Sequence, residues 1–85
     1  MKLQEMNPDA PRPIHQIAMD ISLKWDKVYF GAVPYLQAMH SIQNIDDMYG
    51  LDKARSVVVY FLSNATTFRG EDARRLKAEL RDILK

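Results

Sequence analysis

The 85-residue sequence contains no cysteine, so it can form no disulfide and offers neither a thiolate ligand for zinc nor a thiol nucleophile. Because small secreted domains usually depend on disulfides, this absence favours a reducing cytoplasm. Glycine is also scarce. Its three residues are isolated from one another, which excludes a glycine-rich loop that cradles phosphate groups.

Long apolar stretches are missing as well. No run approaches the roughly 18 apolar residues of a membrane-spanning helix. The first residues, Met1 to Glu5, lack the apolar core of a secretory signal peptide. We therefore expect a protein that neither crosses a membrane nor is exported.

Charge of one sign does not dominate, since 12 Lys and Arg against 11 Asp and Glu give a formal net charge of +1. This balance predicts no general attraction to nucleic acid. The apolar fraction of 47% is ordinary for a globular protein and argues against disorder of the whole chain. A chain of this length forms one domain and buries roughly 60% of its unfolded surface, which makes its stability marginal.

Apolar residues recur with the period of an amphipathic helix in four segments. The strongest pattern comprises Ala54, Val57, Val58, Phe61, Leu62 and Ala65. The next segment along the chain repeats it at Ala73, Leu76, Leu80, Ile83 and Leu84. Two earlier segments show it at Ile14, Ile17, Ala18, Ile21 and Trp25, and at Tyr35, Ala38, Met39, Ile42 and Ile45.

The flanking residues indicate where these helices begin and end. The first helix is expected over about 13–26, and Pro13 and Pro34 suit the first turns of the first and second helices. Asp52 is expected to cap the third helix or to lie in its first turn, and that helix ends near residue 64. Glu71 and Asp72 suit the positive N-terminal end of the fourth helix.

Proline-rich and turn-forming segments separate these helices. Residues 1–12 are expected to form a flexible tail ahead of a single helical domain over 13–85. Residues 29–32 predict a short connection; the alternative, a strand over 28–30, would have no partner strand. A turn is expected over 44–50, with Gly50 in the left-handed conformation.

The predicted fold class is therefore all-α, a small bundle of three to four short helices. Its expected core centres on Trp25, Phe61, Leu36 or Met39, Leu62, Leu76 and Leu80.

Candidate catalytic and metal-binding groups are weak. The two histidines, His15 and His40, have no carboxylate or second histidine three or four residues further along the chain. The acidic residues between 46 and 52 superficially resemble a calcium loop, but they lack the terminal glutamate that such a loop requires. No hydroxyl lies in a nucleophile elbow. We predict no catalytic residue, no metal, no cofactor and no enzymatic activity.

The fourth helix carries a basic face. The candidate nucleic-acid-binding residues are Arg74, Arg75, Lys77 and Arg81. The third and fourth helices could form a helix-turn-helix, in which Arg69, Arg74, Arg75 and Lys77 would face DNA. Against this interpretation, Glu71 and Asp72 would place negative charge at the helix end that should meet phosphates or base edges. The other interpretation is a solvated amphipathic helix.

Eight aromatic residues must share a small core. Tyrosine tolerates one end in water, so Tyr29, Phe30, Tyr35 and Tyr49 would form an adhesive surface for a protein partner if they are not covered. The alternative is that they close the core of the bundle.

Four segments of the chain carry a family resemblance. They read WDKVYFGAVPYLQAM (25–39), IDDMYG (45–50), VYFLSNATTFRG (59–70) and ARR (73–75). Together they resemble a group of small, uncharacterised proteins of bacteriophages and prophages, chiefly of Gram-positive bacteria and actinobacteria. The resemblance covers about residues 14–82, and members often carry Trp at position 68. It implies a phage gene product in the host cytoplasm and no particular activity.

The segment 64–70 allows two interpretations. Phe68 and Arg69 could form a partner site, or Phe68 could fill the core at a helix–helix corner while Arg69 caps carbonyls of the third helix. The corner is favoured.

The residues thus predict a non-enzymatic interaction protein. Its partner would be a phage or host protein or a second copy of the chain, bound through Tyr29, Phe30, Tyr35, Tyr49, Phe68 and Arg69. Self-association would hide apolar surface that a small core leaves exposed. The alternative is a nucleic-acid-binding accessory protein that uses the basic face of the last helix.

Overall fold

The computed structural model describes residues 12–85. Its elements are α1 (Ile14–Lys24), α2 (Val33–Met39), β1 (Met48–Tyr49), β2 (Asp52–Lys53), α3 (Ala54–Ser63) and α4 (Glu71–Leu84). The predicted all-α class is confirmed, because four helices carry the fold and the two short strands form a single hairpin. Residues 1–11 of the predicted tail lie outside the described residues.

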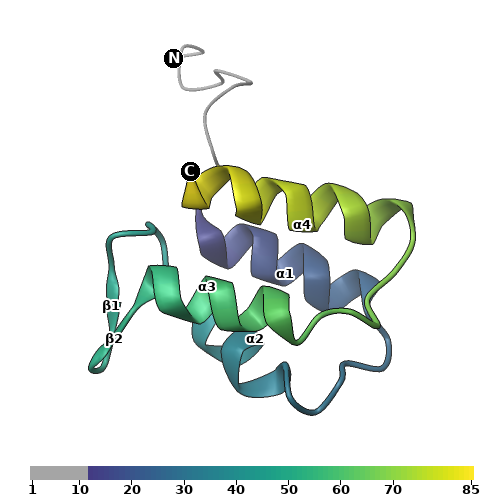
Figure 1. The fold of residues 1–85 in the computed structure, drawn as a ribbon, viewed down its shortest axis with the longest axis horizontal. Coiled ribbons are helices and arrows are strands. Elements are labelled where there is room, and N and C mark those ends of the chain that lie inside the picture. Colours follow the sequence, from purple (N-terminus) through teal and green to yellow (C-terminus); the bar gives the residue numbers. More distant parts are fainter. Residues whose placement is uncertain (1–11) are drawn as a thin grey trace.

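The helices form two pairs. α1 packs along α4, α2 packs against α3, and α1 also contacts α2 (Figure 1). α1 and α4 run in opposite directions, so the start of α1 lies beside the C-terminus. Each helix turns its apolar residues inward, and every predicted helical stripe contributes buried residues to one continuous core.

Aromatic rings join the two pairs of helices. Trp25 stacks on Phe68 with ring centroids 4.9 Å apart and an interplanar angle of 18°, and it meets Phe61 edge-on at 6.2 Å. All three side chains are buried. Phe68 therefore fills the core between α3 and α4, as the corner interpretation predicts.

The other half of the corner interpretation is wrong. Arg69 does not cap α3, because its Nε donates to the carbonyl of Thr66 at 3.3 Å, within the connecting segment. The end of α3 is capped by Asn64, whose Nδ2 donates to the carbonyl of Tyr60 at 2.9 Å. Asn64 follows the helix directly, so its short amide reaches the last turn more easily than Arg69 does.

The hairpin before α3 is an element that the sequence pattern did not predict. Met48 pairs with Lys53, and Tyr49 pairs with Asp52. Gly50 and Leu51 form the two-residue loop between the strands. Gly50 has φ of 62°, which confirms its predicted left-handed conformation. A glycine with positive φ at the first loop position is typical of the two-residue turns that suit the twist of paired strands.

The prediction that Asp52 caps α3 is wrong. Asp52 pairs in the hairpin, and α3 begins only at Ala54 after Lys53, which makes no side-chain cap. The backbone N–H of Ala54 instead donates to the carbonyl of Asp47 at 2.8 Å. The Asp47 carboxylate accepts hydrogen bonds from the N–H groups of Gln43 and Asn44, so it organises the turn before the hairpin.

The remaining helix boundaries differ slightly from prediction. α1 ends at Lys24, and Trp25 donates its backbone N–H to close the last turn. Pro34 lies in the first turn of α2, as predicted, but this helix ends at Met39. Ile42 is nevertheless buried because the following turn keeps it on the inner side, and Leu62 of α3 is only partly buried.

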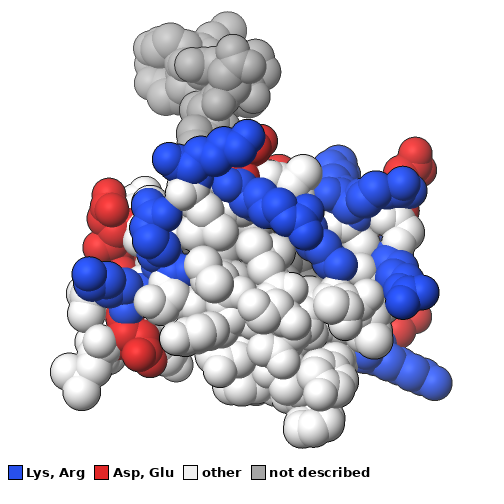
Figure 2. All heavy atoms as spheres, in the orientation of Figure 1, with Lys and Arg blue, Asp and Glu red and all other residues white. Residues whose placement is uncertain are grey.

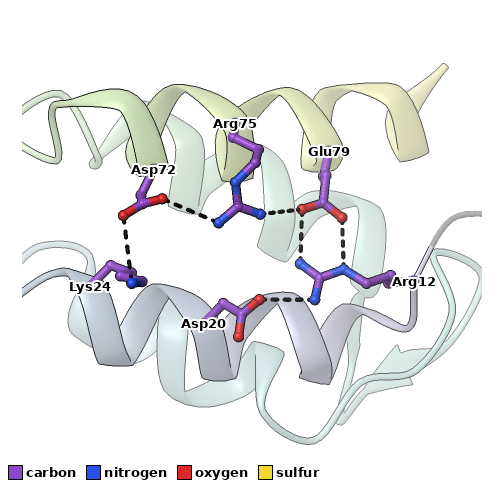
Figure 3. Close-up of polar contacts among 6 residues, drawn as sticks. All are labelled: Arg12, Asp20, Lys24, Asp72, Arg75 and Glu79. Carbon is purple, nitrogen blue, oxygen red and sulfur yellow. Dashed lines mark hydrogen bonds and ion pairs between the residues drawn. The ribbon is translucent and has the colours of Figure 1, made fainter.

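A row of charged side chains bridges α1 and α4 (Figure 3). We call Arg12, Asp20, Lys24, Asp72, Arg75 and Glu79 the ionic row. Arg12 forms a bidentate pair with Glu79, with both N···O distances 2.8 Å, and reaches Asp20 at 2.9 Å. Hydrogen bonding of its guanidinium to the Glu79 carboxylate is the largest cause that raises the pKa of Arg12 above its ordinary value. Arg12, assigned to the tail from sequence, is therefore attached to the helical domain.

Candidate functional site

The two histidines lie apart from each other. His15 is half-buried on α1, whereas His40 is exposed after α2 and has its Nε2 3.0 Å from the Ser22 hydroxyl. Within residues 12–85, no group of three or more His, Asp or Glu side chains is placed to hold a metal ion. In the same part of the chain, no helix combines the length and apolarity needed to cross a lipid bilayer.

The aromatic candidates occupy different environments. Phe68 is buried and presents almost no surface to a partner. Tyr29 and Phe30 are exposed in the connection before α2, with their ring centroids 4.8 Å apart. Tyr35 is partly buried against the core, and Tyr49 is 44% exposed on β1. The six predicted partner residues therefore do not form one surface.

Tyr35 and Tyr49 instead line one hollow together with a third tyrosine. Tyr60 of α3 lies with its ring centroid 5.6 Å from that of Tyr35, and it is 52% exposed. These residues border an open hollow of about 320 Å³ between α2, the hairpin and α3. We call it the tyrosine pocket; it is lined by Pro34, Tyr35, Ala38, Tyr49, Asp52, Val57 and Tyr60.

The hairpin adds exposed apolar surface next to the tyrosine pocket. It projects from the helices at the left of Figure 1. Leu51 at its tip is 98% exposed, and Met48 on β1 is also exposed. A leucine at the tip of a projecting loop contributes nothing to the core, so its apolar side chain is available for contact with another molecule.

The basic candidates also separate. Arg75 belongs to the ionic row, where it contacts Asp72 at 3.4 Å and Glu79 at 3.6 Å. Arg74, Lys77 and Arg81 lie on another side of α4 and border a shallow hollow of about 240 Å³ together with Arg69. We call these four residues the basic cleft. Figure 2 shows Lys and Arg side chains gathered over α4 and the segment that leads into it.

Lys77 lies at the centre of the basic cleft. Its ammonium is 5.8 Å from the centroid of the Phe68 ring. Partial burial is the largest cause that lowers the pKa of Lys77, and repulsion from Arg81 and Arg69 lowers it further. The cleft thus holds positive charges close together without a carboxylate among its lining residues.

A wider hollow of about 450 Å³ lies at the start of α1. Its charged lining comprises Arg12, Asp46, Asp47 and Asp82. Arg12 is engaged by Glu79, Asp47 accepts from two backbone N–H groups, and Asp82 pairs with Lys85, so three of these four charged side chains already have structural partners.

Sequence reasoning missed three residues of the exposed apolar surface, Met48, Leu51 and Tyr60. Tyr60 lies outside the inner stripe of α3, and a large aromatic residue on the outer side of an amphipathic helix is a signal that could have identified it. Leu51 follows a glycine in a turn, where an isolated apolar residue gives no periodic signal. Arg69 was assigned both to the aromatic surface and, in the helix-turn-helix alternative, to the basic residues; its position in space places it with the basic residues of α4.

No protein-family model, curated protein or solved structure matches this chain.

Proposed function

We propose that the protein is a non-enzymatic interaction module that binds a partner protein through the tyrosine pocket. The observation that carries this proposal is the convergence of three tyrosines, from α2, β1 and α3, on one open hollow. Tyrosine is enriched at protein interfaces because its ring packs in an apolar contact while its hydroxyl keeps a polar partner.

The lining of the pocket indicates which group it binds. A hollow of about 320 Å³ with a mainly apolar lining suits a large apolar side chain. Asp52 contributes a carboxylate to the lining and forms no ion pair with residues 12–85. The complementary partner segment therefore presents an apolar residue next to a Lys or Arg.

Leu51 and Met48 extend the contact beyond the pocket. Both lie on the hairpin that carries Tyr49 and Asp52, and both are more than half exposed, at 98% and 57%. An apolar rim that excludes water around a central aromatic contact strengthens that contact. The hairpin therefore acts as one wall of the docking surface.

The source of the partner is proposed from the sequence resemblance. Similarity to small phage and prophage proteins supports a partner encoded by a phage or its host and present in the host cytoplasm. A second copy of the chain is the other possible occupant of the pocket, and the experiment below distinguishes it.

Site-specific photocrosslinking in the native host tests this proposal. A photoreactive phenylalanine in place of Leu51 should trap one defined protein, and Tyr60→Ala in the same chain should reduce trapping about tenfold, since it removes a central contact. A synthetic peptide from the trapped segment should contain an apolar residue beside a Lys or Arg. It should bind the purified protein and lose about tenfold in affinity with Tyr60→Ala.

Two matched variants control for general stickiness. The photoreactive residue in place of Leu23, which is 74% exposed on α1, should not trap the same protein. Phe30→Ala removes a more exposed aromatic side chain outside the pocket and should leave trapping unchanged. Trapping of a second copy alone, or trapping that survives Tyr60→Ala, would contradict the proposed partner site.

A further inference from the structure

The four cations of the basic cleft lie on one side of the molecule, and no carboxylate lines the cleft. Arg74, Lys77 and Arg81 come from α4, and Arg69 comes from the segment that precedes it. None of these four forms an ion pair with a residue between 12 and 85. Folding therefore brings like charges together that an external anion can neutralise.

The acidic residues of α4 are directed elsewhere. Asp72 pairs with Lys24 at 3.7 Å and with Arg75 at 3.4 Å, within the ionic row. Glu79 pairs with Arg12 and Arg75 in the same row. Asp82 pairs with Lys85 at 3.3 Å, and Glu71 is exposed in the first turn; neither residue lines the basic cleft. The acidic residues that oppose nucleic-acid binding in the sequence thus lie outside the cleft.

The spacing of the cations indicates an extended anion. Positions 74, 77 and 81 follow one side of α4, and seven residues of helix span about 10 Å. B-DNA carries one phosphate charge per about 1.7 Å of its axis, so a length of about 10 Å presents about six phosphates, enough to face all four cations.

The cleft lacks an exposed surface for base stacking. Phe68, its aromatic lining residue, is only 3% exposed and is already stacked on Trp25. Proteins that hold single strands place bases on exposed aromatic rings, so this site does not suit single-stranded nucleic acid. It suits a duplex, which presents its phosphates outward.

We propose that the basic cleft binds the phosphate backbone of duplex DNA without recognising base sequence. Arg69, Arg74, Lys77 and Arg81 each contact phosphate oxygens, and the bound phosphates relieve the repulsion around Lys77. This differs from a helix-turn-helix, because α4 lies along the backbone and does not enter a groove. The activity is separate from partner binding at the tyrosine pocket.

Salt-dependent binding to a fluorescent 20-base-pair duplex of arbitrary sequence tests the proposal. Four phosphate contacts predict a slope of log K against log salt of about −3.6, and thus roughly a 100-fold loss of affinity between 50 and 200 mM salt. The variant Arg74→Gln/Lys77→Gln/Arg81→Gln should reduce the slope to about −1. Duplexes of different sequence should bind equally.

The matched control removes three positive charges elsewhere. Lys24→Gln/Lys27→Gln/Lys53→Gln changes the net charge by the same amount, alters no residue of α4 or of the cleft, and should retain the slope of the unmodified protein. The unfolding temperature of the cleft variant should be unchanged or higher, because crowded cations are removed, so loss of binding cannot be assigned to unfolding.

Three outcomes would overturn the proposal. Equal loss of binding in the control and cleft variants would show attraction by net charge alone. Displacement of the duplex by an equal concentration of inorganic phosphate would show a site for a small anion. Tighter binding to a duplex RNA or a single strand of the same length would show that the backbone of duplex DNA is not the ligand.

Discussion

At the scale of single residues, Phe68 links the connection before α4 to the core. Its ring is buried and stacks on Trp25, so Phe68→Ala should lower the free energy of unfolding by about 3–4 kcal/mol. Denaturant unfolding followed by fluorescence of the single Trp25 measures this loss. Phe68→Trp preserves a large stacked ring and should cost much less; equal losses for the two variants would contradict the stacking role.

Lys77 reports the electrostatics of the basic cleft. Burial and the charges of Arg81 and Arg69 lower its pKa, so Arg81→Gln should raise that pKa by removing one repelling charge. The ¹³Cε chemical shift of Lys77, followed by NMR against pH, measures the change. Arg75→Gln on the ionic row is the control and should leave the pKa of Lys77 unaltered.

The same lowered pKa has a consequence for stability. Folding disfavours the charged form of Lys77. At neutral pH Lys77 is charged in both the folded and the unfolded protein, so it lowers the free energy of unfolding there. The cost disappears as the pH rises from the pKa in the folded state to that in the unfolded state, about 10.4. The free energy of unfolding relative to Lys77→Gln should therefore increase over that interval.

At the scale of elements, the ionic row aligns α1 with α4. Arg12→Gln removes the bidentate pair with Glu79. In this pair the Arg12 side chain is 36% exposed and the Glu79 side chain 28% exposed. Since these groups are partly solvated, the expected loss is about 1 kcal/mol. For a domain of this size, that corresponds to a decrease of about 4–8 °C in the unfolding temperature.

Salt and a second variant separate this effect from a general change in charge. High salt should shrink the loss caused by Arg12→Gln, because it screens the pair. Lys85→Gln removes a pair with Asp82 in which the Lys85 side chain is 80% exposed and the Asp82 side chain 71% exposed. This variant should change the free energy of unfolding by less than about 0.5 kcal/mol. Equal effects of the two variants would show that Arg12 does not align the helices.

At the scale of the whole molecule, the tyrosine pocket and the basic cleft use different elements. The pocket lies between α2, the hairpin and α3, whereas the cleft is formed by α4 and the segment before it. They share no lining residue, so their mutational effects should be independent. Tyr60→Ala should leave duplex binding unchanged, and the cleft variant should leave crosslinking from position 51 unchanged. Loss of both activities in either variant would show that the two surfaces are coupled.

The helices were predictable because each one repeats apolar residues with a 3.6-residue period over two or more turns. The hairpin was not, because strands of two residues are too short to show alternation. Asp52 was misassigned for a related reason: an acidic residue just before a helix suits both a cap and a strand end. Only the chain path distinguishes the two roles.

The candidate surfaces depended more strongly on tertiary structure. The sequence by itself determined the helical class, the apolar stripes and the presence of basic and aromatic residues, since these follow from local composition and period. Tertiary structure alone decided that Tyr60 joins Tyr35, and that Arg75 is paired while Lys77 is not. The physical reason is distance along the chain: Arg12 meets Glu79 across 67 residues, and no local pattern encodes which charges folding will pair.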